Sequence, residues 1–303
     1  MKKVKIGTRG SKLALAQTNL VIHQLNYHHP ELTFDIQTIQ TKGDLHQCVA
    51  LEKIGDKGLF VKEIEQQLIE GVIDLAVHSM KDMPSVMPAG LVFATTPKRE
   101  DPRDVLVLKE PYQKLTELPA GAAIGTGSKR RKYQLLRLRP DLNIVPIRGN
   151  IETRMSKIET QNLAGVILAA AGLIRGGYEK RITEYLPIDK VIPAPAQGAL
   201  ALQIRADNLW IADILQVIGD QQAQIEVEAE RGFLEGVSGT CHQPIGARAS
   251  IVDNEMRLVG LYGNKEGHLV VDHAVGLVTG ARALGLSLGV KLRKQVFGGD
   301  ENG

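Results

Sequence analysis

The sequence predicts an α/β fold with two α/β domains and a small α+β domain towards the C-terminus. Over most of the 303 residues, short apolar strands alternate with segments of helical periodicity, which is typical of sheets built from parallel strands. Two proline-containing segments, Asp101-Pro102-Arg103 and Pro193-Ala194-Pro195, interrupt this alternation and mark crossings between domains. After Cys241 the pattern changes to successive strands and one final helix, which indicates the α+β domain.

The first hundred residues begin with a strand at Val4–Thr8. Ser11 can then cap a helix, because apolar residues such as Val21 and Leu25 follow at helical spacing. Further along, we expect a strand at Leu32–Thr38, a polar loop at Thr41–Gly58, a helix at Leu59–Glu70 and strands at Ile73–Val77 and Leu91–Thr95.

A second series of the same kind follows. Its expected elements are strands at Val105–Leu108, Ala122–Thr126, Ile144–Ile147 and Val166–Ala170, and helices that begin at Ser128 and Asn150. Ala199–Arg205 is one more expected strand, which could return to the first sheet. The remaining chain is expected to hold a helix at Gln221–Gly236, a tight turn at Asn264–Gly267 and a helix near Ala281–Val296.

The composition is that of a protein with a sizeable core. The hydrophobic fraction is 43%, and no apolar run reaches the roughly 18–20 residues of a membrane span. Two cysteines cannot make a disulfide framework, and the opening Met-Lys-Lys leads into a strand rather than into the apolar region of a signal peptide. We therefore expect a soluble cytoplasmic protein with reduced thiols.

The formal net charge of +3 is mild, but it is unevenly distributed. Residues 125–154 contain eight basic and two acidic side chains, a net charge of +6, which leaves the rest of the chain at −3. A local surplus of this kind indicates an anion site rather than a generally basic protein.

Three strand-to-helix junctions combine small polar residues, glycine and arginine. They are Thr8-Arg9-Gly10-Ser11, Thr126-Gly127-Ser128-Lys129-Arg130-Arg131, and Arg148-Gly149-Asn150 followed by Arg154. At such a junction the free backbone N–H groups and the helix dipole favour an anion, and arginine matches a carboxylate or phosphate through two parallel hydrogen bonds. One junction could be an ordinary helix cap, whereas three together favour a ligand with several carboxylates or phosphates.

A fourth junction, His78-Ser79-Met80-Lys81-Asp82-Met83-Pro84, follows an expected buried strand and carries one carboxylate. Asp82 could be an exposed turn residue, which is common. It could also point into a cleft lined by cations, where its carboxylate could stabilise a developing positive charge or move a proton. The spacing alone leaves both interpretations open.

Cys241 lies on a polar loop with no apolar neighbour before Ile245, unlike a buried structural cysteine. A redox role would need a resolving cysteine, and the chain has no Cys-x-x-Cys. An acyl-transfer role would need a base beside the thiol, and His242 is adjacent in sequence, which usually directs its side chain elsewhere.

Two other ligand classes are not expected. His46 with Cys48, and Cys241 with His242, lack the spacing of paired zinc ligands, so we expect no metal. The basic run could bind nucleic acid on charge alone, but Tyr133 is its one aromatic residue and no nucleic-acid motif accompanies it.

Several blocks of the chain resemble the porphobilinogen deaminase (hydroxymethylbilane synthase) family, in the same order as in that family. They are Thr8–Gln17, Thr41–Asp44, Gly55–Glu63, His78–Pro84, Thr126–Arg131, Arg148–Asn150 with Arg154, Pro195–Leu200 and Cys241–Gly246. So many blocks in register are highly specific, and they span most of the chain.

The resemblance implies a transferase of tetrapyrrole (haem) biosynthesis. The family attaches a dipyrromethane cofactor through a thioether to the loop cysteine, here Cys241, and assembles this primer from its own substrate. Four porphobilinogen molecules are then added head to tail, each losing ammonia, and water releases the linear hydroxymethylbilane. Asp82 would be the catalytic carboxylate, close to the cation that the loss of ammonia leaves behind.

The resemblance also assigns binding residues by motif position. The cofactor would be held by Ser11, Lys81, Asp82, Thr126, Ser128, Arg130, Arg131, Arg148 and Gly149. The substrate would be bound by Arg9, Ser11, Gln17, Arg148, Asn150 and Arg154, and from a lid loop by Lys53, Lys57 and Phe60.

Three domains are implied: residues 1–98 with 198–217, residues 99–197, and residues 218–303. The first two would be similar to periplasmic binding proteins, and the third would carry Cys241. The implied protein is a monomer that acts on a small molecule, without a nucleic-acid or membrane partner. The alternative from another class is a two-lobed anion receptor without chemistry, which would need neither Cys241 nor Asp82.

The chain departs from the family pattern at five positions. The family usually has Gly in place of Asp56, Ala196 and Thr240, and Ser and Leu in place of Gly127 and Lys129. None of these changes removes a catalytic group, but Asp56 and Thr240 bear on the lid and on the loop of the tether.

Overall fold

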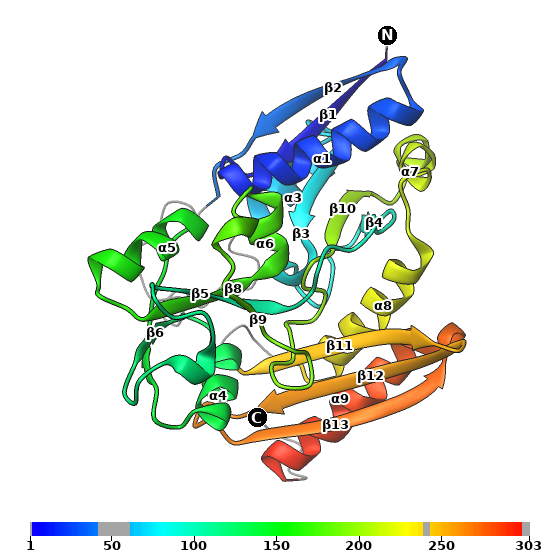
Figure 1. Cartoon of the computed structure of the whole chain (residues 1–303). Coiled ribbons are helices and arrows are strands. Elements are labelled where there is room, and N and C mark those ends of the chain that lie inside the picture. The colour runs from blue at the N-terminus through cyan, green and yellow to red at the C-terminus, as the bar shows by residue number, and fades with distance from the viewer. Residues whose placement is uncertain (1, 42–60, 239–242, 299–303) are drawn as a thin grey trace. The chain divides into compact units, whose positions relative to one another are not determined.

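The computed structural model describes residues 2–41, 61–238 and 243–298 (Figure 1). The chain divides into two compact units: Met1–Glu100 with Gly198–Gln224, and Asp101–Gln197 with Ile225–Gly303. Each unit has its own five-stranded sheet, and the second unit also contains a three-stranded sheet. The expected fold class, two α/β domains and a small α+β domain, is thereby confirmed, while the individual domain boundaries stay a prediction.

The sheet of the first unit has the strand order β2-β1-β3-β10-β4. Its strands are β1 (Lys2–Thr8), β2 (Leu32–Thr38), β3 (Leu75–Ser79), β4 (Leu91–Phe93) and β10 (Leu200–Arg205). β1 pairs in parallel with β2 and β3, whereas β10 runs antiparallel to both β3 and β4. The expected return of the 199–205 segment to the first sheet is confirmed.

Helices cover both faces of this sheet because its strands alternate between two apolar sides. The helices of the unit are α1 (Lys12–His28), α3 (Lys62–Ile69) and α7 (Leu209–Gln216). Val77 faces a core with Val21 of α1 and Ile211 of α7, and its neighbour Ala76 faces a second core with Ile64 of α3. α7 was not expected from the sequence.

The five-stranded sheet of the second unit has the order β7-β6-β8-β5-β9. Its strands are β5 (Asp104–Leu108), β6 (Ala123–Gly125), β7 (Asn143–Val145), β8 (Gly165–Ala169) and β9 (Glu184–Tyr185), and its helices are α4 (Lys129–Leu138), α5 (Ile151–Thr160) and α6 (Ala170–Arg175). β6 is parallel to β7 and β8, and β5 is antiparallel to β8 and β9.

The expectation of parallel sheets is therefore wrong for one strand of each sheet, β10 in the first and β5 in the second, each of which is antiparallel to both of its neighbours. A helical crossover is what holds consecutive strands parallel. β5 and β10 begin within a few residues of the points where the chain passes from one unit to the other, at residues 100–101 and 197–198, so no such crossover fixes their direction. The strand expected at Ile73–Val77 is also shifted: β3 continues to Ser79 because it pairs there with Leu200 of β10.

The three-stranded sheet is antiparallel and packs against two helices (Figure 1). Its strands are β11 (Ile245–Val252), β12 (Glu255–Gly263) and β13 (Leu269–Leu277), and the helices are α8 (Gln221–Gly236) and α9 (Ala281–Phe297). Phe233 of α8, Tyr262 of β12 and Leu292 of α9 fill this core. Both helices and the tight turn before β13 agree with the sequence-based expectation. In the described part of the chain, every helix is too short or too polar to cross a membrane.

Helices α8 and α9 approach each other closely at glycines. A Cβ atom on Gly285 would lie 1.9 Å from the carbonyl oxygen of Ala229, and one on Gly232 would lie 2.3 Å from the carbonyl oxygen of Arg282. The absence of these side chains lets the two backbones touch.

Gly285→Ala is expected to lower the free energy of unfolding by about 3 kcal/mol, because the atom in the way belongs to the α8 backbone and cannot rotate aside. Gly280→Ala is the matched control, since a Cβ there meets nothing within 4 Å. It should change the free energy by less than about 0.5 kcal/mol. Denaturant unfolding measures both, and equal effects would contradict the close approach.

Candidate active site

In the first unit, the predicted site residues gather at the carboxyl ends of the parallel strands, where α/β sheets usually bind ligands. β1 ends at Thr8 and β3 ends at Ser79. The pairing of Gly7 with Ala76 places Arg9 about level with His78. Ser11 caps α1 by accepting a hydrogen bond from the backbone N–H of Ala14 at 3.2 Å.

Asp82 lies on a single 3-10 turn, Met80–Asp82, directly after β3. Met80 and Met83 are buried on either side of it. The backbone N–H of Met80 donates to the Ala199 carbonyl at 3.0 Å, and that of Met83 donates to the Met80 carbonyl at 3.1 Å. The turn is thus anchored at both ends, while Asp82 itself is exposed.

Gln17 reaches the same region from α1. Its side chain is buried, and its Nε2 lies 3.0 Å from the hydroxyl oxygen of Ser79, to which it donates. Gln17 therefore joins α1 to the end of β3, three residues before Asp82.

Beneath this turn, His78, Gln203 and Glu65 form a buried polar chain. Nε2 of His78 is 3.1 Å from Oε1 of Gln203, whose Nε2 donates to Glu65 at 2.9 Å. Burial lowers the pKa of His78 from 6.5 to about 4, with a further decrease from the charge of Arg9 and a partial increase from Gln203. His78 is therefore neutral at physiological pH. Burial raises the pKa of Glu65, against the hydrogen bond from Gln203 and the charge of Lys62.

The lowered pKa of His78 predicts acid sensitivity. The unfolded chain binds a proton here below pH 6.5, but the folded protein does so only below about pH 4, so stability falls as the pH drops through this window. Between about pH 7 and pH 5, this histidine should cost about 2 kcal/mol of unfolding free energy. Glu65 opposes it in part, because its raised pKa favours the folded state at lower pH.

Urea unfolding of the wild type and of His78→Gln at both pH values measures this contribution. The variant should lose less stability on acidification than the wild type. Identical losses in the two proteins would mean that His78 does not stay neutral in the folded state.

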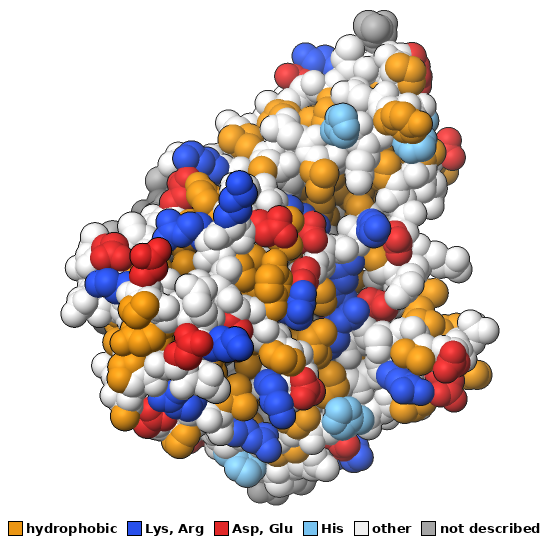
Figure 2. Space-filling model, viewed as in Figure 1, with side chains coloured by type: hydrophobic (Ala, Val, Ile, Leu, Met, Phe, Trp, Pro, Cys, Tyr) orange, Lys and Arg blue, Asp and Glu red, His pale blue; other side chains and the backbone are white. Residues whose placement is uncertain are grey.

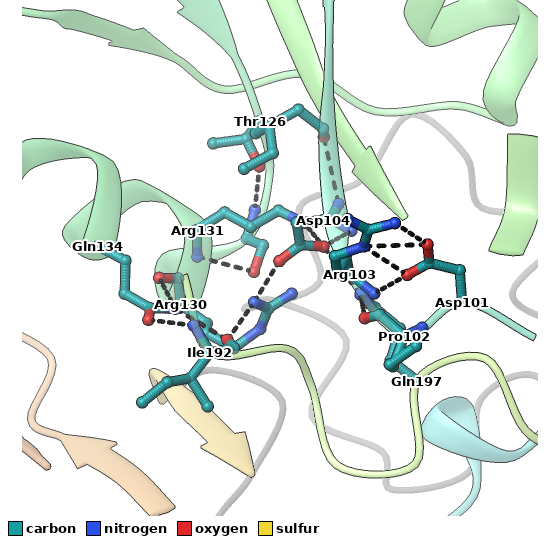
Figure 3. Close-up of polar contacts among 12 residues, drawn as sticks. Asp101, Pro102, Arg103, Asp104, Thr126, Arg130, Arg131, Gln134, Ile192 and Gln197 are labelled. Atoms are coloured by element: carbon teal, nitrogen blue, oxygen red, sulfur yellow. Dashed lines mark hydrogen bonds and ion pairs between the residues drawn. The ribbon is translucent and has the colours of Figure 1, made fainter. Parts of the chain in front are cut away.

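In the second unit, the arginines of the Thr126–Arg131 junction meet a buried carboxylate that the sequence did not suggest (Figure 3). Nη1 of Arg130 donates to Asp104 at 2.5 Å, and Nη2 of Arg131 donates to its other oxygen at 2.7 Å. All three side chains are buried. Because β5 runs antiparallel to β8, its first residue, Asp104, lies at the carboxyl edge of β8.

The ion cluster carries one net positive charge. Burial tends to raise the pKa of Asp104, but Arg130 and Arg131 outweigh it and hold this pKa well below its usual range. Gln197, from the Pro195–Leu200 block, also donates to Asp104 at 2.9 Å. Arg130 also donates to the Ile192 carbonyl at 2.7 Å, so the ion cluster fixes the segment before Gln197 as well.

The turn before α4 lies close to the segment that follows β7. Ser128 caps α4, and its backbone N–H donates to the hydroxyl of Thr126 at 3.2 Å. A Cβ on Gly127 would lie 2.7 Å from the carbonyl oxygen of Ile147, so this chain could not carry the family's usual Ser there without moving the backbone.

At the third junction, after β7, basic side chains of α5 donate hydrogen bonds to backbone carbonyls of the junction. Asn150 caps α5 by accepting from the N–H of Thr153 at 2.8 Å. Arg154 donates to the Gly149 carbonyl at 2.8 Å, and Lys157 donates to the Arg148 carbonyl at 2.9 Å. Gly149 has φ of +116°, which favours glycine.

The positive surplus of residues 125–154 is smaller in the structure than in the sequence. Asp104, from outside this window, neutralises one of its positive charges. Within the window, Arg139 pairs at 2.7 Å with Asp141, which the net charge of +6 already includes. On the face drawn in Figure 2, Lys and Arg side chains are interspersed with Asp and Glu. In the described ranges, no three His, Cys, Asp or Glu side chains gather as metal ligands would.

Another departure from the family pattern has a conformational consequence. Ala196 has φ of +58°, in the left-handed region that favours glycine, and its N–H donates to the buried Glu230 at 2.5 Å. Glu230 also accepts from the backbone N–H of Ala249 at 2.9 Å, so this carboxylate joins α8 to both segments.

The predicted site residues thus divide between the two units, and some lie outside the described residues. The first unit holds Arg9, Ser11, Gln17, Lys81 and Asp82, and the second unit holds Thr126, Ser128, Arg130, Arg131, Arg148, Gly149, Asn150 and Arg154. Lys53, Lys57, Phe60, Asp56, Thr240 and Cys241 lie outside the described residues, as does the expected loop between residues 42 and 58.

The chain is similar to known proteins over most of its length. Residues 4–213 match the model described as "Porphobilinogen deaminase, dipyromethane cofactor binding domain", and residues 224–294 match "Porphobilinogen deaminase, C-terminal domain". A porphobilinogen deaminase of Clostridioides difficile is 56% identical, covering 96% of this chain and 97% of the relative. One of Clostridium novyi is 51% identical, covering 97% and 99%.

Among solved structures, a periplasmic binding protein of Salmonella typhimurium with high arginine specificity is similar over 72% of this chain and 92% of its own, with 13% identity and a TM-score of 0.40. The sequence matches are far stronger and cover both units. By these matches, the chain belongs to the porphobilinogen deaminase family.

Proposed function

We propose that this protein joins four porphobilinogen molecules head to tail into hydroxymethylbilane, on a dipyrromethane primer bound to Cys241. The main support is the match of residues 4–213 to the cofactor-binding domain of the family. We place the reaction in the cytoplasm and take the enzyme to act as a monomer on a small-molecule substrate.

The described residues fit an anionic primer. Each pyrrole ring of the primer carries an acetate and a propionate, so two rings bring four carboxylates. Three helices begin at capped turns next to arginine, at Ser11, Ser128 and Asn150. Helix starts of this kind favour negative charge, and the buried Arg130–Asp104–Arg131 cluster adds one net positive charge behind the second of them.

Each group of residues then has a separate task. Ser11 and Lys81 would bind primer carboxylates from the first unit, and Thr126, Ser128, Arg130, Arg131, Arg148 and Gly149 would do so from the second. Arg9, Gln17, Asn150 and Arg154 would bind the side chains of the incoming substrate, and Lys53, Lys57 and Phe60 would act from the lid. When bound, the primer supplies a nucleophilic pyrrole carbon to which the first substrate is joined.

Asp82 would act on the reacting ring. The aminomethyl carbon of porphobilinogen loses ammonia, and the positive charge that remains is shared with the pyrrole nitrogen. A carboxylate within hydrogen-bond reach stabilises this charge and can accept and return the N–H proton. The anchored turn around Asp82 suits this task, because a fixed carboxylate needs no reorganisation as the charge develops.

The intact mass of the purified protein tests the proposal. We expect the sequence mass plus two linked pyrrole units for the wild type and for Cys48→Ser, which keeps the tether. Cys241→Ser should have the bare sequence mass and no activity. A wild-type protein at its bare mass after holoenzyme purification would favour the anion receptor without chemistry.

A further inference from the structure

The buried chain of His78, Gln203 and Glu65 takes no part in the proposed chemistry. It lies between α3 and the first sheet, in a layer that is otherwise apolar and includes Ile64 and Ala76. Polar groups are rarely buried in such a layer unless each is hydrogen-bonded, and here the two contacts run in series from α3 to β3.

With Glu65 ionised, the direction of these hydrogen bonds is determined. Glu65 as a carboxylate can only accept, so the amide nitrogen of Gln203 must face it. The amide oxygen of Gln203 then faces His78 and must accept, so Nε2 of His78 carries the hydrogen. His78 is therefore held as one tautomer, with a lone pair on Nδ1.

The hydrogen-bonded series from Glu65 through Gln203 to His78 ends next to the proposed catalytic turn. His78 lies on β3, four residues before Asp82, which is on the turn that follows the strand. The positive charge of Arg9 contributes to the lowered pKa of His78. Gln203 sits opposite Ala76 in the antiparallel pair and reaches diagonally to His78, so its amide fixes β10 against β3. β10 in turn leads back to Ala199, whose carbonyl accepts the N–H of Met80.

We propose that His78 and Gln203 are positioning residues, which hold the end of β3 and thereby set where the carboxylate of Asp82 stands relative to Arg9. Glu65 anchors the chain on α3. This inference rests on the proposed function of Asp82. A neutral imidazole suits this position, because a protonated His78 would place a second positive charge near Arg9 and the two charges would repel each other.

Turnover measurements on the holoenzyme test this role. Gln203→Leu and Glu65→Leu each remove a member of the hydrogen-bonded series. Glu65 is the member on α3, at the end of the series opposite to His78. Each should lower kcat by about tenfold or more, while KM stays within about threefold and the primer mass is retained. Glu65→Gln keeps an acceptor for Gln203 and should stay within about threefold of wild type in kcat.

Ile64→Val is the control for a merely structural role, because this fully buried neighbour on α3 should lose stability without losing kcat. Folded Leu variants with wild-type kcat would overturn the proposal, whereas failure of the proposed function would appear as an unaffected Asp82→Asn. Nitrogen-15 spectra of histidine-labelled wild-type holoenzyme need no variant that could misfold. They should show His78 neutral at neutral pH with the hydrogen on Nε2, and the other tautomer would also overturn the proposal.

Discussion

Asp82→Asn is expected to retain the covalently attached primer but to lose turnover by about a hundredfold or more. Asparagine keeps the shape of the side chain, so the turn between Met80 and Met83 should fold as before. It carries no charge to stabilise the cation left by ammonia loss, and its amide cannot take up the pyrrole proton. Attachment survives because one slow assembly per molecule is sufficient, whereas turnover repeats the step.

Asp213→Asn is the matched control for this variant. Asp213 is an exposed carboxylate of α7 in the same unit, and its replacement should leave the rate within about twofold of wild type. Intact mass and product formation are measured on the same preparations. A rate for Asp82→Asn close to that of the control would refute the catalytic role.

Arg131→Leu is expected to block primer assembly and also to destabilise the fold. Its guanidinium makes two hydrogen bonds to the buried Asp104, and Leu would leave this carboxylate with Arg130 as its one cation. Removing one partner of a buried ion pair typically costs about 3 kcal/mol or more. Denaturant unfolding and intact mass should therefore both change.

Arg148→Leu separates binding from stability. Arg148 is half-buried and lies at the β7 junction, away from the contacts of Asp104. We expect it to block primer assembly or elongation while the unfolding free energy changes by less than about 1 kcal/mol. Unchanged product formation in both arginine variants would disprove the carboxylate-binding role of these junctions.

Local features of the site were predictable from the sequence. Ser11, Ser128 and Asn150 cap their helices as expected, because a cap depends on a side chain and a backbone group three residues away. α8 was also predicted with the bounds that it has, since its helical pattern is long and uninterrupted.

Long-range partners were not predictable in this way. Asp104 meets Arg130 and Arg131 because β5 runs antiparallel to β8, and apolar alternation does not encode strand direction. Gln203 and Glu65 are 138 residues apart, and only the return of β10 to the first sheet brings them together. An acid at the start of a buried strand was the one available signal for Asp104, and it does not identify the partners.

The place of β10 also constrains how the protein can be made. Among the strands that the structure describes, β4 pairs with β10 alone, so its edge stays open until residues 200–205 have left the ribosome. A nascent chain that ends before Leu200 would present unpaired backbone groups on both β3 and β4, which are templates for wrong strand pairing. The N-terminal half of the sequence therefore cannot finish folding as it emerges, and chaperone demand during synthesis should be highest before this strand arrives.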